Sequence, residues 1–198
     1  MLFVVTGPSG CGKSTMIRHV MRDLRNVRFS VSHTTRPPRP SEADGKDYHF
    51  VSRAVFERMI ARRQFAEWAV VHGQLYGTSR REITGRRGSA DVILDIDVQG
   101  AKQLMASGIP AVTVFVLPPL YQDLIRRLRA RGEDKPDVIA RRLRNARSEV
   151  RQAAKFEYLI VNDRLDRAVL ELESIILASR CRLGARRTAL RRAIASFK

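Results

Sequence analysis

The sequence predicts an α/β protein in which helices cover both faces of a parallel sheet. Short apolar runs typical of strands alternate with segments of helical period along most of the 198 residues. A glycine-rich turn also joins the first of these strands directly to the first helix. Strands that alternate with helices are expected to lie parallel in one sheet. In such a sheet, ligands bind at the carboxyl ends of the strands.

The elements of this sheet can be placed in order along the chain. Strands are expected at residues 2–6, 27–32, 92–94, 111–117 and 158–161. Helices are expected at 13–24, 101–107 and 120–129, then up to about 154, and finally up to about 179. The last helix begins after Asn162 or Asp163, either of which could cap it.

Residues 33–80 have a different character. Aromatic and polar residues mix there, as in Asp47-Tyr48-His49-Phe50, and glycines interrupt the pattern. We interpret this region as a small strand-rich insertion. The predicted parts are a core of residues 1–31 and 89–180, an insertion of residues 32–88, and a basic tail of residues 181–198.

Composition excludes several classes of protein. The apolar share of 44% is neither that of a disordered chain nor that of a membrane protein. No run is long enough for a membrane helix or a signal peptide, so we expect a soluble cytoplasmic protein without a membrane partner. The two cysteines are far apart and the four histidines are scattered, which disfavours disulfides and zinc.

The formal net charge of +17 favours anionic partners. Part of that charge belongs to the tail, because arginines continue after Glu173 and acidic residues do not. The tail keeps a helical pattern of apolar residues at Leu183, Leu190, Ile194 and Phe197. We expect it to pack on the body or to fray in solvent, rather than to bind nucleic acid or a membrane, since charge runs are usually solvated.

A phosphate-binding loop lies between the first strand and the first helix. The sequence GPSGCGKST fits the pattern G-x-x-x-x-G-K-[ST] in the strand–loop–helix context that the motif requires. Its glycines let backbone N–H groups point at phosphate oxygens, and the helix adds a partial positive charge. The predicted ATP-binding residues of this loop are Gly7, Pro8, Ser9, Gly10, Cys11, Gly12, Lys13, Ser14 and Thr15.

Two kinds of group are expected beside the loop. Lys13 places a full charge on the β- and γ-phosphates, and Ser14 offers its hydroxyl to Mg²⁺, the expected cofactor of ATP. Asp95 and Asp97 follow a buried strand, and Asp95 is the expected second metal-side residue, although the pair could also cap a helix. Cys11 is expected to favour its thiolate near the helix N-terminus. Alkylation of this thiol should then inactivate the protein.

Three further stretches give the chain a resemblance to the guanylate kinase family. They are FSVSHTTRPPRPSEADGKDYHFV from Phe29, EWAVVHGQLYGTS from Glu67, and ILDIDVQGA from Ile93. With the phosphate-binding loop, the resemblance extends from about residue 2 to residue 178 and leaves the tail outside. It implies a P-loop nucleoside monophosphate kinase fold with a small GMP-binding insertion and a helical lid at about 126–145.

The resemblance also assigns roles around the phosphate of GMP. Arg36 and Arg39 would clamp the phosphate, since guanidinium groups match its oxygens. Tyr48 and Tyr76 would donate their hydroxyls to it. Arg36 is in addition a predicted catalytic residue, together with Lys13.

Guanine would be read by a carboxylate and two hydroxyls. Glu67 would accept hydrogen bonds from N1–H and the 2-amino group, which adenine cannot offer. Ser32 and Thr78 would add hydrogen bonds to the base. Asp97 would lie near GMP, and Asp95 nearer the metal.

Arginines of the lid would offset charge on the transferring phosphoryl group. The predicted residues are Arg127, Arg131 and Arg142. Other arginines are neighbours, so each assignment could be displaced to one of them, and a solvated basic helix face is the alternative. Asn162 matches a family position near adenine, with helix capping as its alternative.

The implied activity is transfer of the γ-phosphoryl group of MgATP to GMP, and also to dGMP, in guanine nucleotide synthesis and recycling. ATP and GMP are the expected partners of a monomer or homo-oligomer. A kinase for another acceptor is one alternative, and Glu67, Ser32 and Thr78 argue against it. A non-catalytic binding module is another, and Lys13, Ser14 and Asp95 argue against that. Nucleic-acid binding through the tail stays open.

Overall fold

The computed structural model describes residues 1–71, 73–84, 90–130 and 136–197. Its main sheet has the strand order β2-β7-β1-β8-β9, and every neighbouring pair is parallel. The strands are β1 (Leu2–Thr6), β2 (Val27–Phe29), β7 (Asp91–Asp95), β8 (Val112–Leu117) and β9 (Tyr158–Val161). The predicted fold class is therefore confirmed, because crossovers along the chain have produced a parallel sheet.

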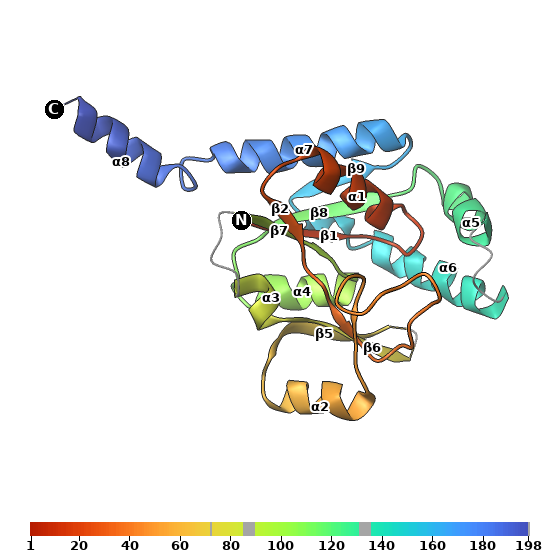
Figure 1. Ribbon diagram of the computed structural model, residues 1–198. Coiled ribbons are helices and arrows are strands. Elements are labelled where there is room, and N and C mark those ends of the chain that lie inside the picture. The colour runs from red at the N-terminus through yellow and green to blue at the C-terminus, as the bar shows by residue number, and fades with distance from the viewer. Residues whose placement is uncertain (72, 85–89, 131–135, 198) are drawn as a thin grey trace.

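Both faces of the sheet are covered, so its central strand is buried throughout. Alternate residues of β1 point to opposite faces. Phe3 and Val5 join the core that contains residues of α1 (Lys13–Asp23) and α7 (Leu165–Cys181). Leu2 and Val4 join the core that contains residues of α4 (Val98–Ala106). Figure 1 shows α1 and α7 on one side of the sheet and α4 on the other.

The insertion forms a second, mixed sheet of order β4-β3-β6-β5. Its strands are β3 (His33–Thr34), β4 (His49–Phe50), β5 (Phe65–Val71) and β6 (Gln74–Ser79), and α3 (Arg80–Thr84) follows them. The strand predicted at 27–32 is shorter than expected, because the chain leaves the main sheet after Phe29 and joins the second sheet at His33.

A helix that the sequence did not predict packs against the second sheet. This helix, α2 (Arg53–Ala61), begins at Ser52, whose side chain accepts a hydrogen bond from the N–H of Val55. Its Phe56 is fully buried and stacks on Phe65 with ring centroids 4.4 Å apart. Six of its nine residues are apolar but only Phe56 is buried, and the expectation of a strand-rich insertion over residues 33–80 left this helix out.

Two helices lie beyond the carboxyl ends of the main strands (Figure 1). They are α5 (Tyr121–Ala130) and α6 (Pro136–Val150), and a 3-10 turn, η1 (Ala153–Lys155), follows. Leu124 and Leu128 of α5 share a small apolar core with Ala146 of α6. The predicted turn around 132–136 lies almost entirely outside the described residues.

The tail forms a helix, α8 (Arg187–Ser196), that stands away from the body (Figure 1). Every residue from Cys181 to Phe197 is exposed. Of the two arrangements expected for the tail, packing on the body is wrong, exposure to solvent agrees with the second, and the helical pattern is confirmed. Its Ala, Leu and Arg residues favour a helix without tertiary support.

Candidate active site

The phosphate-binding loop runs from the end of β1 to the start of α1 and has a backbone that only glycine adopts easily. Gly7, Gly10 and Gly12 have φ angles of 139°, 92° and 98°. A Cβ atom at Gly7 would also collide with the carbonyl oxygen of Val116 on β8. These glycines therefore let the loop curl tightly against the sheet at the N-terminus of α1.

Lys13 and Ser14 face the end of β7. The Nζ atom of Lys13 donates to the carbonyl oxygen of Gly7 at 2.8 Å and lies 3.8 Å from Oδ1 of Asp95. The hydroxyl of Ser14 donates to Oδ2 of the same carboxylate at 2.9 Å. The structure thus brings the predicted lysine, hydroxyl and acid into one cluster at the carboxyl edge of the sheet.

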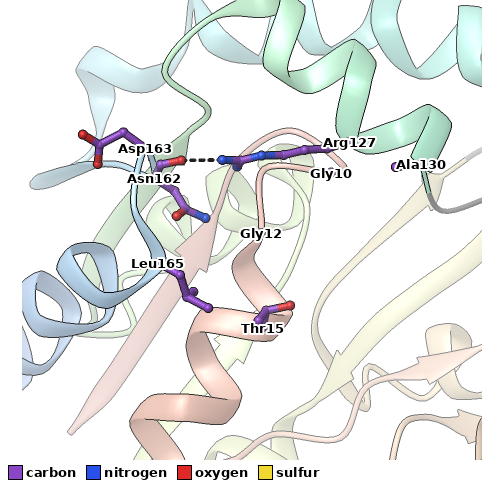
Figure 2. Close-up of a pocket in the computed structure, with 8 residues that line it drawn as sticks. All are labelled: Gly10, Gly12, Thr15, Arg127, Ala130, Asn162, Asp163 and Leu165. Atoms are coloured by element: carbon purple, nitrogen blue, oxygen red, sulfur yellow. Dashed lines mark hydrogen bonds between the residues drawn. The ribbon is translucent and has the colours of Figure 1, made fainter.

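Arg127 and Asn162 bind the back of the loop (Figure 2). Arg127 donates to the carbonyl oxygens of Cys11 at 3.2 Å and Asn162 at 2.8 Å, and the Asn162 side chain donates to the Cys11 carbonyl at 2.8 Å. They line a pocket of about 480 Å³ together with Gly10, Gly12, Thr15, Ala130, Asp163 and Leu165.

The first residue before α7 is not the predicted cap. Arg164 occupies that position, and its side chain forms no capping hydrogen bond. The prediction that Asn162 or Asp163 caps the helix is therefore wrong. Asn162 is buried and uses its amide to hold the phosphate-binding loop instead. It therefore ties the end of β9 to the loop beside the pocket.

The expectation of a reactive thiolate at Cys11 is also wrong. The side chain of Cys11 is fully buried among the residues of the core. Burial raises the pKa of this thiol, although the positive charge of Lys13 acts in the opposite direction. The apolar surroundings therefore outweigh the helix N-terminus, and the residue acts as part of the core.

Of the other two predicted lid arginines, the structure describes Arg142 and not Arg131. Arg142 on α6 donates to the hydroxyl of Ser9 at 3.4 Å, so it reaches the phosphate-binding loop. Arg141 and Arg144, its neighbours, are exposed. Arg131 lies outside the described residues.

A buried cluster of polar side chains in and beside the second sheet contains the residues expected to read the base. Glu67 is 4% exposed, and its Oε1 accepts a hydrogen bond of 2.8 Å from the N–H of Thr78. The hydroxyls of Ser32 and Thr78 are 3.3 Å apart. Burial raises the pKa of Glu67 to about 7, against the hydrogen bonds of Thr78, which lower it. The protein thus holds a carboxylate in an environment that penalises its charge.

Gly100 makes room for this carboxylate. Gly100 lies in α4, so close to Glu67 that a Cβ atom added to Gly100 would collide with Oε2 of Glu67. The added Cβ would also lie 3.2 Å from Oδ1 of Asp97. Asp97 caps α4, because its Oδ1 accepts a hydrogen bond of 2.9 Å from the N–H of Gly100. Asp97 therefore lies on the side of Glu67, while Asp95, at the end of β7, faces Lys13 and Ser14.

Three of the four residues expected to hold the acceptor phosphate come together. Arg36 donates to the hydroxyl of Tyr76 at 3.2 Å, and its guanidinium carbon lies 5.6 Å from the ring centre of Tyr48. The two tyrosine rings meet edge to face at 5.8 Å. Burial raises the pKa of the Tyr48 hydroxyl, so this group stays a hydrogen-bond donor.

Glu42 is a member of this cluster that sequence reasoning missed. Its carboxylate accepts a hydrogen bond of 2.8 Å from the guanidinium of Arg36 and another of 2.8 Å from the backbone N–H of Arg39. Burial alone would raise the pKa of Glu42, but these two bonds hold it below its usual value. Residues 36–42 form neither a helix nor a strand, so no periodic pattern could have identified Glu42.

Glu149 is a second missed residue. It lies seven residues after Arg142, two turns along the same face of α6. Burial raises the pKa of Glu149, the charge of Lys13 lowers it, and the charge of Asp97 raises it. The pKa of this carboxylate therefore responds both to Lys13 in the phosphate-binding loop and to Asp97 beside Glu67. In an arginine-rich helix, a single glutamate carried no pattern that could have identified it.

Comparisons with known proteins agree with this geometry. A model of the guanylate kinase family matches residues 1–179. The chain belongs to the guanylate kinase family. It is 48% identical to a guanylate kinase of Dechloromonas aromatica over 94% of this chain and 93% of the relative. It is 50% identical to a guanylate kinase of Syntrophotalea carbinolica over 92% of this chain and 87% of the relative.

A solved guanylate kinase has the same fold. The crystal structure of guanylate kinase from Anaplasma phagocytophilum superposes with a TM-score of 0.76 and is 29% identical, over 92% of this chain and 87% of that one. Membership of the guanylate kinase family makes the chain a nucleoside monophosphate kinase, an enzyme that acts on small-molecule nucleotides. The family match ends at residue 179, so α8 lies beyond it.

Proposed function

We propose that this guanylate kinase transfers the γ-phosphoryl group of ATP to GMP, giving ADP and GDP. The observation that carries the proposal is the buried carboxylate of Glu67 beside the hydroxyls of Ser32 and Thr78. With Oε1 held by a backbone N–H, the carboxylate can accept hydrogen bonds from N1–H and the 2-amino group of guanine. Adenine has an acceptor at N1 and no 2-amino group, so it would be repelled.

The phosphate of GMP would bind between Arg36, Arg39, Tyr48 and Tyr76. Glu42 supports this assignment, because a carboxylate already lies on the guanidinium of Arg36 and the N–H of Arg39. These donors suit an anion with several oxygens. None of the proposed contacts involves the 2′ position of the ribose, so we propose that dGMP is accepted too.

ATP would bind with its phosphates in the loop of residues 7–15. Lys13 would move from the carbonyl of Gly7 onto the β- and γ-phosphates, and Arg142 reaches the same loop through Ser9. Asn162 lines the neighbouring pocket, where we place adenine. Arg127 and Arg131 would complete the positive environment of the transferring phosphoryl group. Arg127 lies on α5 and already donates to the carbonyl oxygen of Cys11 in the loop.

Mg²⁺ is the proposed cofactor, and the residues present fit it. Ser14 and Asp95 supply a hydroxyl and a carboxylate oxygen that already lie within hydrogen-bond distance of each other. Oxygen ligands of this kind suit Mg²⁺, which binds phosphates and few protein groups. When bound, it would offset negative charge on the phosphates of ATP.

Positioning and electrostatics would carry the catalysis, because phosphoryl transfer needs no covalent intermediate. Lys13, Arg36, Arg127, Arg131 and Arg142 are the proposed catalytic residues. Asp97 would lie near GMP at the start of α4. Closure of the second sheet over GMP and of α5 and α6 over ATP would exclude water and suppress hydrolysis.

We also propose that the enzyme works in the cytoplasm, in guanine nucleotide synthesis and recycling. Both cysteines carry free thiols, which fits a reducing compartment. Among the described residues, no helix is long and apolar enough to cross a membrane.

The proposal is tested by measuring ADP release from MgATP with GMP, dGMP, AMP, UMP and CMP, and without acceptor. We expect turnover with GMP and dGMP, and at least a thousandfold lower kcat/KM with AMP, roughly as for sites built to hydrogen-bond a polar group. Equal turnover with AMP would contradict the role of Glu67. ADP release without an acceptor would indicate an ATPase, and no release at all would favour a binding module.

A further inference from the structure

The helix α8 is amphipathic, and none of its side chains is buried against the described residues of the body. Leu190, Ile194 and Phe197 are 43%, 54% and 90% exposed. Their spacing of four and three residues places them along one side of the helix. Leu183, just before the helix, is 66% exposed. Apolar side chains gathered in this way on a surface indicate an interaction site.

The other side of α8 is positively charged. Arg192 lies on it, Arg191 flanks the apolar side, and Arg187 lies at the edge of that side, three residues before Leu190. Acidic residues are absent from the sequence after Glu173, so nothing in the tail offsets this charge. An anionic surface therefore complements the tail electrostatically.

We propose that α8 binds the surface of an anionic lipid bilayer. In this arrangement the apolar side chains enter the boundary between headgroups and acyl chains, and the arginines contact anionic headgroups. RNA would use the arginines but leave the apolar side in water. A second copy of α8 would bring two cationic helices together, and ten residues offer too little area for a stable protein interface.

The position of α8 leaves the nucleotide sites open. Near the C-terminus of α7, Arg180 donates to Asp91, the first residue of β7, at 2.7 Å. Arg186 then donates to the carbonyl of Arg180 at 3.0 Å. The tail thus departs from the amino edge of the sheet, opposite the phosphate-binding loop (Figure 1). Membrane binding and catalysis can occur together.

This proposal revises the sequence-based expectation that the enzyme has no membrane partner. That expectation treated the tail as a packed or solvated segment, whereas the structure leaves its apolar side unpartnered. Binding to the surface of a bilayer does not require a spanning helix. The proposal is independent of the proposed substrate, because it concerns residues outside the nucleotide sites.

The test uses the full chain in flotation with two kinds of vesicle, phosphatidylcholine alone or mixed equally with phosphatidylglycerol. We expect binding to the mixed vesicles only, with the partition coefficient falling as salt is raised. The R191Q/R192Q variant should bind roughly 25-fold more weakly, about fivefold for each arginine. The I194S/F197S variant should lose at least tenfold, on the order expected for two apolar side chains left in water.

Matched variants on the body distinguish binding through α8 from the general effects of net positive charge and exposed apolar side chains. R58Q/R62Q removes two exposed arginines at α2, and L170S removes an apolar side chain that is 62% exposed on α7. Both should bind vesicles like the unmodified chain, and all variants should keep their ADP release with GMP. Equal binding by tail and body variants would overturn the proposal. So would equal binding to pure phosphatidylcholine, or binding to RNA and not to vesicles.

Discussion

Glu67 is the residue on which the proposed choice of GMP depends most directly. Its carboxylate is buried, and one oxygen is already bonded to the N–H of Thr78. We predict that Glu67→Gln lowers kcat/KM for GMP about a hundredfold, because an amide cannot accept two hydrogen bonds from guanine as a carboxylate does. The measurement is ADP release at varied GMP.

The thermal midpoint of the Glu67→Gln variant is the control for folding. Because the amide still offers an oxygen to Thr78, we expect no large loss of stability. The Glu57→Gln variant on α2, at an exposed acid, should have unchanged kinetics. If Glu67→Gln retained full activity with GMP, another group would have to read the base.

The pKa of Glu67 predicts how stability depends on pH. Burial raises this pKa from 4.5 in the unfolded chain to about 7 in the folded chain. The stability that this group contributes is therefore complete below pH 4.5 and is lost as the pH rises through about 7. Chemical denaturation from pH 5 to pH 8 should show this loss for the ligand-free protein, and Glu67→Gln should reduce it.

Guanine binding should have the opposite dependence on pH. The ionised carboxylate is the form that accepts both hydrogen bonds of guanine, so the affinity for guanosine should increase as the pH rises from 6 to 8. Guanosine lacks the phosphate, whose own titration would otherwise interfere. Calorimetry in buffers of different ionisation enthalpy should detect proton release. A pH-independent affinity, with no proton released, would contradict a role for this ionisation.

Cys11 gives a prediction opposite to the one its sequence position suggests. Its thiol is fully buried and has a raised pKa, whereas Cys181 is exposed. Iodoacetamide should therefore label Cys181 in the native protein and Cys11 only after unfolding, with activity retained. Mass spectrometry of the labelled peptides measures this directly. Rapid labelling of Cys11 with loss of activity would restore the thiolate hypothesis.

At the scale of elements, α6 brings one arginine to the phosphate-binding loop. Arg142 bonds to Ser9, while Arg141 and Arg144 are exposed on the same helix. We predict that Arg142→Met lowers kcat about a hundredfold, as for other lost charge-stabilising donors, with KM for GMP nearly unchanged. Arg141→Met and Arg144→Met are matched controls and should stay within about twofold. Equal losses in all three would favour a general effect of charge.

The elements of the main sheet were predictable because both faces are buried. Strands such as Phe3-Val4-Val5 are apolar without interruption and end in glycine or aspartate, which makes them easy to recognise. The phosphate-binding loop was predictable for a related reason, since its glycines and lysine follow one spacing. Family resemblance supplied what spacing alone could not, including the pairing of Ser32 with Thr78 across 46 positions.

What the sequence missed depends on contacts between distant elements. Helix α2 is held by Phe56 against Phe65, a contact that no local period expresses. The thiol of Cys11 is governed by the core around it and not by the helix that follows. Asn162 had two readings, and only the carbonyl of Cys11 opposite its amide separates them. The charge of Lys13 lowers the pKa of Glu149 only because the fold brings these distant positions near each other.

At the scale of the whole molecule, the tail should be separable from the enzyme. No side chain of α8 is buried, and the family match ends at residue 179. We predict that deleting residues 184–198 changes the thermal midpoint by no more than about 2 °C and leaves kcat with GMP unchanged. Calorimetry and ADP release measure both. A drop of many degrees would mean that the tail supports the core.

The direction of α7 has a practical consequence. This helix of 17 residues starts beside the pocket that adjoins the phosphate-binding loop and ends at the first residue of β7, roughly 25 Å away. Anything attached after it is carried to the far end of the molecule. A fluorescent label, a fusion partner or a solid support joined at the C-terminal side of α8 would leave substrates free access. The enzyme could therefore be immobilised through its tail without blocking turnover.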